Sequence, residues 1–239
     1  MTVPLHHPRL LPTMPTARHV TMPPALLMPT LRVLTMIVVL IPATWAVELA
    51  VRDIDLGLVS WPRSFDWKLS SEVVDDSGRD AFAGAGGLRV GMRWSLSRPG
   101  SAVGLMASGD VMMLTMQYQG SEGLNAIAGR IGLGGAWAVR DSVTLSAEVG
   151  AGYGLGTMRF PASVASTASS VDGTMLLYDA QARVTWHLAR QWSINASVGW
   201  VVASHSLSGS GTSIDLDQDG LMFGLGIGWR YSDLPPLLE

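Results

Sequence analysis

Charged residues recur at alternate positions within otherwise apolar stretches, and these are the residue types with the greatest capacity for chemistry in this sequence. In LRVGMRW at 88–94, Arg89 and Arg93 alternate with bulky apolar residues. A period of two places the charges on one face of a β-strand and the apolar residues on the other. Because a charge removed from water must be paired, the set predicts a network of ion pairs. Its five basic and five acidic members are Asp53, Asp55, Arg89, Arg93, Asp110, Arg130, Glu148, Asp179, Arg183 and Arg230.

A second pattern, SHSLS at 204–208, contains the residue types of a nucleophile and its base. A serine nucleophile needs a base within hydrogen-bonding distance. Neighbouring residues of a strand point to opposite faces, so His205 cannot readily activate Ser204 or Ser206. We therefore expect no enzyme and assign no catalytic residue.

A third pattern, DLDQDG at 215–220, resembles the beginning of an EF-hand calcium loop. The position that should carry the bidentate glutamate is Gly226, so a true EF-hand is excluded. Asp215, Asp217 and Asp219 remain a metal candidate for a looser Ca²⁺ or Mg²⁺ contact, and the alternative is a solvated acidic loop end. No other metal and no cofactor is expected.

The composition excludes several classes of protein. There is no cysteine, which rules out disulfides and thiolate metal sites. The net charge of −3 gives no basic field for nucleic acid, so we expect no nucleic-acid partner. Only 15% of the residues are charged, and Lys68 is the one lysine. A soluble domain needs more charge than this to cover its surface.

The first part of the chain carries the pattern of an export signal. Residues 28–46 combine Arg32, an apolar run from Val33 to Ile41 and small residues before a cleavage point. We interpret them as a Sec-type signal peptide, because nine apolar residues are too few for the ~20 that span a bilayer. Residues 1–27 are interpreted as a non-native or disordered extension that precedes the true start. We expect a barrel over 47–231 and a short periplasmic tail over 232–239.

Eight stretches of strict alternation follow, which predicts strands. They lie at about 53–61, 81–96, 102–116, 125–139, 143–156, 175–188, 192–207 and 220–231. Long loops are expected at about 62–80, 117–124, 157–174 and 208–218, and tight turns at 97–101, 140–142 and 189–191. Long and short connections in alternation are typical of an up-and-down transmembrane barrel. The predicted fold is therefore an all-β, eight-stranded antiparallel up-and-down transmembrane β-barrel preceded by a cleavable signal peptide.

The apolar face is expected to point outward, into lipid. The opposite face consists mostly of Gly, Ala, Ser and Thr with single charges, whereas a solvated exterior would carry many long charged side chains. Aromatic residues also recur beside the short turns and at the last strand, where a membrane barrel has its aromatic girdle. The predicted girdle is Trp94, Trp137, Trp186, Trp192, Trp229 and Tyr231. Tyr153, Tyr178 and Trp200 are candidates for an opposite ring.

On these features residues 53–231 resemble the barrel domain of eight-stranded outer-membrane proteins of the OmpA/OmpX type. The resemblance implies that the last strand is an assembly signal for the barrel-insertion machinery, carried by Gly226, Trp229 and Tyr231. SDLPPLLE follows this strand, and Gly224 stands where a polar residue is typical, so the match departs from the pattern at two points. The resemblance further implies the outer membrane of a Gram-negative-type bacterium, with membrane lipid and lipopolysaccharide as partners.

The expected function is non-enzymatic: an envelope-structural or surface-adhesion role through long extracellular loops. The lumen would be closed by the charge network, because an eight-stranded barrel is filled by its own side chains. One alternative is a lipid A-modifying enzyme, since such enzymes share this barrel. A further alternative is a narrow gated pore or proton path, with His187 as a titrating member. The oligomeric state stays open.

Overall fold

The computed structural model describes residues 50–71, 75–96, 103–118, 123–159, 170–189, 191–209 and 211–230. All of them belong to the compact unit Val47–Glu239. The expected extension at 1–27, the signal peptide at 28–46 and the tail at 232–239 lie outside the described residues. Within the described part of the chain, no helix is both long and apolar enough to cross a membrane.

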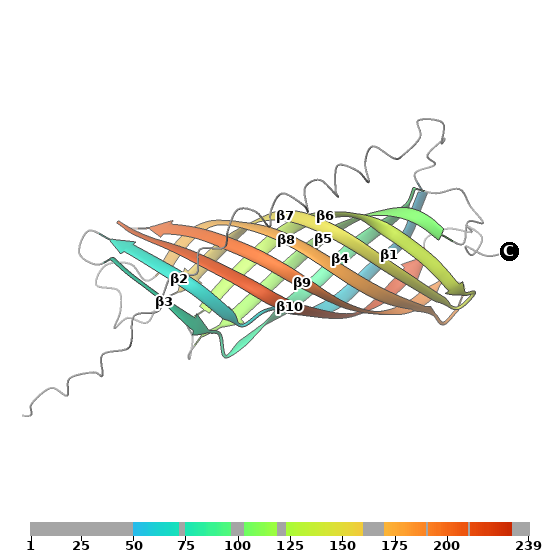
Figure 1. Ribbon diagram of the computed structural model, residues 1–239, viewed down its shortest axis with the longest axis horizontal. Helices are drawn as coiled ribbons and strands as arrows, with labels where there is room; N and C mark the ends of the chain where they lie inside the picture. Colours follow the sequence, from blue (N-terminus) through green and yellow to red (C-terminus); the bar gives the residue numbers. More distant parts are fainter. Residues whose placement is uncertain are drawn as a thin grey trace, which may run out of the picture. The chain divides into compact units, whose positions relative to one another are not determined.

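The described chain forms ten antiparallel strands in one sheet (Figure 1). They are β1 (Ala50–Ser60), β2 (Ser64–Ser71), β3 (Asp75–Ala81), β4 (Gly84–Ser95), β5 (Val103–Gln117), β6 (Gly123–Arg140), β7 (Val143–Arg159), β8 (Ser170–His187), β9 (Trp192–Gly209) and β10 (Thr212–Arg230).

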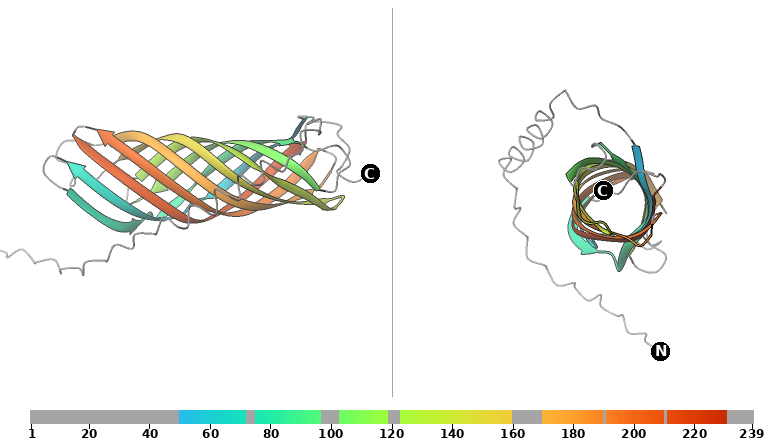
Figure 2. Two further views of the ribbon diagram at one scale, coloured as in Figure 1. Left: turned by 45° about the horizontal axis from the view of Figure 1, so that its top comes forward. Right: turned by 90° about the vertical axis from the view of Figure 1, so that its right-hand side faces the viewer.

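Eight of these strands close into a barrel, which Figure 2 shows end-on as a ring. The order is β1, β4, β5, β6, β7, β8, β9, β10, and β10 pairs back to β1. Ile54 lies opposite Trp229, and Leu58 lies opposite Leu225. The predicted eight-stranded up-and-down barrel is confirmed, including closure of the last strand onto the first.

The predicted loop at 62–80 is wrong, because most of it forms the β2–β3 hairpin. β2 pairs with the first half of β10, and β3 pairs with β2 (Figure 1). Ser60 lies opposite Gly86, and Ser64 lies opposite Ala81. The hairpin therefore continues the β1–β4 pair beyond a short interruption. We call this end of the barrel the loop end and the opposite end, with the turn at Asp141 and Ser142, the turn end.

The predicted loop at 208–218 is also wrong. β9 continues to Gly209 and β10 begins at Thr212, which leaves a tight turn where Gly211 has φ +77°. Glycine adopts this left-handed conformation without steric cost. The DLDQDG segment is consequently part of a strand, with its three aspartates on the outer face.

The outer surface changes character along the strands. On β9, apolar Trp200 and Val202 are exposed, whereas Ser204 and Ser206 are the next exposed residues toward the loop end. On β10 the change falls between Asp219 and Leu221. The apolar section is the lipid-facing belt of a transmembrane barrel, and the polar section beyond it lies outside the membrane-spanning segments.

The interior changes in the opposite sense. In the membrane section it is polar and charged, but at the loop end it is an apolar core. Phe82, which the alternation places on the outward face with Leu88, is instead 2% exposed in this core. Phe82 and Ala83 lie in the break between β3 and β4. The alternation of inward and outward residues along β4 therefore does not extend to Phe82. Other core members include Trp61, Phe65, Met116, Leu124, Met175, Leu207, Ile214 and Leu216.

Candidate functional site: the charged lumen

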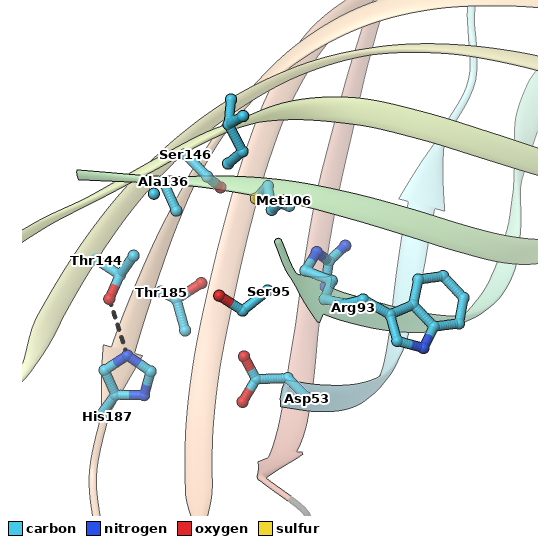
Figure 3. A pocket seen from close by; sticks show the side chains of 12 residues that line it. Asp53, Arg93, Ser95, Met106, Ala136, Thr144, Ser146, Thr185 and His187 are labelled. Carbon is cyan, nitrogen blue, oxygen red and sulfur yellow. Dashed lines mark hydrogen bonds between the residues drawn. The ribbon is translucent and has the colours of Figure 1, made fainter. Parts of the chain in front are cut away.

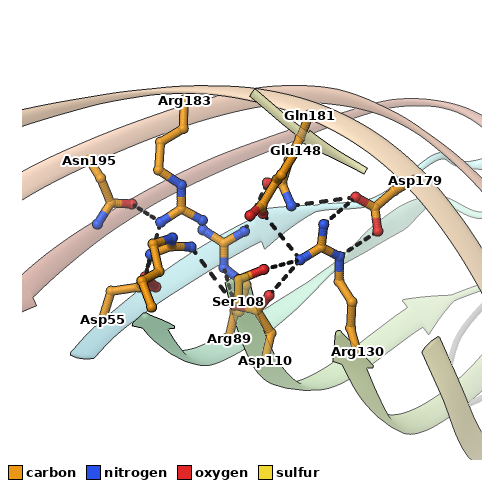
Figure 4. A network of polar contacts seen from close by, with 11 residues as sticks. Asp55, Arg89, Ser108, Asp110, Arg130, Glu148, Asp179, Gln181, Arg183 and Asn195 are labelled. Atoms are coloured by element: carbon orange, nitrogen blue, oxygen red, sulfur yellow. Dashed lines mark hydrogen bonds and ion pairs between the residues drawn. The ribbon is translucent and has the colours of Figure 1, made fainter. Parts of the chain in front are cut away.

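The membrane section of the lumen holds eight of the ten predicted network residues in one cluster (Figure 4). Their side chains point inward because each lies on the non-lipid face of its strand. All are at most 8% exposed. They are Asp55 on β1, Arg89 and Arg93 on β4, Asp110 on β5, Arg130 on β6, Glu148 on β7, and Asp179 and Arg183 on β8.

Arg130 is the centre of the acidic part of the cluster. Its Nε and Nη2 donate to the two oxygens of Asp179, at 2.5 and 2.7 Å. Its Nη1 lies 2.8 Å from Asp110 Oδ2 and 3.1 Å from Glu148 Oε1. One guanidinium therefore joins carboxylates from three different strands, and the contact with Asp179 is bidentate, the strongest geometry available to this pair.

Glycines make the space that Arg130 occupies. A Cβ atom on Gly150 would lie 2.5 Å from Arg130 Cζ, and one on Gly132 would lie 3.0 Å from Arg130 Nη1. Both distances are shorter than ordinary contacts between heavy atoms. Gly150 on the neighbouring β7, and Gly132 two residues further along β6, therefore leave the space in which the Arg130 guanidinium lies.

The basic part of the cluster is arranged around Asp55. Its Oδ2 accepts hydrogen bonds from Arg93 Nη1 and from Arg183 Nη1, the latter at 3.0 Å. Arg183 Nη1 also lies 3.4 Å from Asn195 Oδ1, and Arg89 Nη1 donates to Gln181 Oε1 at 3.3 Å. Asn195, Gln181 and Ser108 were not predicted as members. The alternation places these three residues on the inward face, but an uncharged side chain gives no reason to assign it to a network of ion pairs.

The remaining two predicted residues form a separate group at the turn end. Arg230 Nε lies 3.7 Å from Asp53 Oδ1. Arg230 Nη2 donates to the His187 ring, at 3.0 Å from Nδ1 and 3.3 Å from Nε2, and His187 Nε2 lies 3.0 Å from Thr144 Oγ1. A cavity of about 30 Å³ opens beside this group (Figure 3). Asp53, Arg93, Ser95, Thr144, Ser146, Thr185 and His187 are among the residues that line it.

The SHSLS segment has the geometry that the alternation predicts. Ser204 and Ser206 point outward and donate to Asp217 and Asp215, at 2.6 and 2.8 Å. His205 points into the loop-end core, is 1% exposed, and donates from Nε2 to Gln218 Oε1 at 3.0 Å. Burial lowers the pKa of His205 to about 4, although the hydrogen bond with Gln218 opposes the shift. The histidine is a buried neutral residue, and neither Ser204 nor Ser206 lies on its side of the sheet.

This burial predicts a pH dependence of stability. His205 binds its proton less readily in the folded protein than in the unfolded chain, where its pKa is about 6.5. Stability from this group is complete above pH 6.5 and is lost as the pH falls toward 4, by about 3 kcal/mol. Urea unfolding of the refolded barrel between pH 7.5 and 4 measures the loss. The difference between wild type and His205→Leu should grow in the variant's favour as the pH falls. Parallel profiles would contradict the prediction.

The three aspartates of DLDQDG do not converge. Asp215, Asp217 and Asp219 alternate along the outer face of β10, and the first two accept hydrogen bonds from serines. Across the residues that the structure describes, no group of three or more His, Cys, Asp or Glu side chains is arranged to hold a metal ion. A solvated acidic strand end is the arrangement observed.

The predicted aromatic girdle occupies the outer face near the turn end. Trp137, Trp186, Trp192 and Trp229 are each about half exposed, at 53, 57, 52 and 49%. The rings of Trp192 and Trp229 stack with centroids 5.9 Å apart. Trp94 is half-buried because its ring covers Gly109. Tyr231, predicted for both the girdle and the assembly signal, lies outside the described residues.

Comparison with known proteins returns matches in structure alone. Neither a family model nor a curated protein matches the sequence. The attachment invasion locus protein Ail of Yersinia pestis is 14% identical, with a TM-score of 0.38 over 75% of this chain and 99% of Ail. The outer membrane protein OprG of Pseudomonas aeruginosa is 13% identical, with a TM-score of 0.47 over 75% of this chain and 96% of OprG. The outer membrane protease OmpT of Escherichia coli is 8% identical, with a TM-score of 0.43 over 79% of this chain and all of OmpT.

The closed strand order and the exposed apolar belt are sufficient to identify a transmembrane β-barrel. Only a closed barrel satisfies every backbone hydrogen bond of strands that face lipid. The protein is an eight-stranded transmembrane β-barrel.

Proposed function

We propose that the protein is a non-conducting, non-enzymatic outer-membrane barrel that acts through the polar surface at its loop end, in envelope structure or adhesion. The observation that supports this proposal is the filling of the lumen by two different barriers in series. The charge network fills the membrane section, and the apolar core fills the loop end.

A continuous water path would have to cross both barriers. Arg89 and Asp110 occupy the membrane section with at most 4% of their surface exposed. Beyond them, Met112, Met175 and Leu177 are at most 2% exposed. Opening the network alone would leave the apolar core closed, and this disfavours the gated pore and the proton path.

The loop-end surface has the chemistry of a surface exposed to water and sugar. β3 is exposed at every residue, and the outer face of β10 carries aspartates beside the hydroxyls of Ser204 and Ser206. Contact with lipopolysaccharide, through hydroxyl hydrogen bonds or divalent cations bridging carboxylates to phosphates, fits this surface. Recognition of the last strand by the barrel-insertion machinery, through Gly226 and Trp229, is part of the same proposal.

A lipid A-modifying enzyme has less support. The nearest serine and histidine lie on opposite faces of β9, and the serine hydroxyls donate to aspartates rather than to a base. A nucleophile and its base must be within hydrogen-bonding reach on one face.

Planar-bilayer recording tests the closed lumen. We expect the purified, refolded barrel to produce no discrete conductance steps, because both barriers must open before ions pass. Insertion is verified on the same sample by the difference in gel mobility between boiled and unboiled protein, and a general porin in the same bilayers is the positive control. Reproducible unitary steps that scale with the amount of barrel would overturn the closed lumen.

A further inference from the structure

The charges of the lumen are unevenly distributed. Arg130 alone is surrounded by three carboxylates. On the other side, three guanidiniums from two strands gather around the single carboxylate of Asp55. We call these three, Arg89, Arg93 and Arg183, the arginine cluster. The network as a whole is balanced, but the arginine cluster sets three positive charges against Asp55 and Asp110, and Asp110 is shared with Arg130. The cluster therefore carries an excess of positive charge.

The arginine cluster also contains hydrogen-bond donors that lack an acceptor. Five guanidinium nitrogens are buried without a hydrogen-bond acceptor among the described residues. They are Arg89 Nε and Nη2, Arg93 Nε and Nη2, and Arg183 Nη2. Two carboxylate oxygens of the same region, Asp55 Oδ1 and Asp110 Oδ1, are also buried without a donor, and Asp110 Oδ1 lies 3.9 Å from Arg89 Nε and 4.0 Å from Arg93 Nη2. The five donors outnumber these two acceptor oxygens. Buried donors to a charged group that lack an acceptor are costly.

An anion would satisfy both features at once. Arginine presents its N–H groups in a rigid fork suited to anions, and the three side chains are 2, 8 and 3% exposed, so bulk water screens them weakly. We infer that the arginine cluster is a binding site for a small inorganic anion of the size of chloride. This site is independent of the loop-end surface and adds a ligand to the closed lumen.

The cavity at the turn end gives a route to the arginine cluster. Arg93 belongs to the arginine cluster and also lines this cavity (Figure 3). The hydroxyls of Ser95, Thr144, Ser146 and Thr185 also line it and can replace part of an anion's hydration shell. About 30 Å³ of this cavity is open to water molecules, which is enough for a small hydrated anion to reach Arg93.

Thermal unfolding of the refolded barrel in chloride-free detergent buffer tests the inference. A ligand that binds only the folded state stabilises it with the logarithm of its concentration above Kd. We expect the unfolding midpoint of wild type to rise with sodium chloride relative to sodium gluconate at equal ionic strength. Arg183→Gln should lose this difference. Arg79→Gln, which removes an exposed arginine of the β2–β3 hairpin far from the arginine cluster, should retain it. Equal midpoints in the two salts for wild type, or a chloride effect that persists in Arg183→Gln, would overturn the inference.

Crystals of the wild-type barrel soaked in bromide provide a second test that needs no variant. We expect an anomalous peak within about 3.5 Å of guanidinium nitrogens of the arginine cluster. Peaks confined to other places, or none, would count against the site even if Arg183→Gln failed to fold.

Discussion

Replacing Arg130 with methionine should lower the free energy of unfolding by about 3–5 kcal/mol, because the change strands buried carboxylates that have lost their partner. Asp110, Glu148 and Asp179 all lose their contact with the same guanidinium. Methionine keeps the flexible apolar stem of the side chain and removes the guanidinium, so the loss reports the charge, its hydrogen bonds and the space that the group filled. Urea unfolding in detergent micelles, followed by tryptophan fluorescence, measures the effect.

Arg79→Met is the matched control. Arg79 also pairs with an aspartate, Asp66, at 3.7 Å, but both side chains are largely exposed on the β2–β3 hairpin. An exposed pair contributes about 0–1 kcal/mol, so this variant should unfold close to wild type. If Arg130→Met lost no more stability than Arg79→Met, the network would be hydrated and screened rather than a stabilising plug.

Gly150→Val is expected to have the second-largest effect, a loss of about 1–3 kcal/mol from overpacking. The new Cβ would lie 2.5 Å from Arg130 Cζ, and the wall of β7 cannot retreat without breaking its pairing with β6 and β8. The arginine must move instead and give up its bidentate contact with Asp179. The same urea titration measures this loss.

Gly129→Val separates this steric effect from the general effect of adding a β-branched residue. Gly129 faces outward on β6, and a Cβ there would meet no atom within 4 Å. Valine also suits a strand better than glycine, so this variant should be as stable as wild type or slightly more stable. Equal losses in the two variants would show that Gly150 is not required for the space it leaves to Arg130.

Strict alternation made the barrel predictable from the sequence. The outward row from Leu221 to Trp229 repeats without an exception, and a one-residue slip would turn it inward. The face of each charged residue follows from the same pattern. Tight turns such as Asp141–Ser142 were recognisable because they interrupt alternation for only two residues.

The loop end was less predictable because its polarity is reversed. Ile214 and Leu216 face inward, while the aspartates between them face outward. A strand of the membrane section has its apolar residues outward, so this segment resembles an acidic loop in the sequence. On the hairpin, β3 has the sequence DDSGRDA, with no large apolar residue to mark a strand. Phe82 was predicted to face outward, because no residue type in the sequence marks the break between β3 and β4 that shifts the alternation.

The pairings within the lumen could not be predicted either. Alternation shows that Arg130 and Asp179 face inward, but their strands, β6 and β8, are not neighbours in the sheet. Whether they meet depends on strand tilt and on how far each side chain reaches across the barrel. That Arg130 joins three carboxylates while Asp55 is shared by two arginines is therefore a property of the closed barrel.

The change of the outer surface from apolar to polar along the strands also fixes how deeply the barrel sits in the membrane. From Leu221 to Trp229 the lipid-facing row of β10 extends roughly 26 Å along the strand, which the tilt of such strands reduces to about 20 Å across the membrane. If the barrel moved along the membrane normal by two residues toward the turn end, Asp219 would enter the hydrocarbon. If it moved the other way, Leu221 would be exposed to water. The barrel therefore cannot drift along the membrane normal, and the β2–β3 hairpin is held at a fixed height above the lipid.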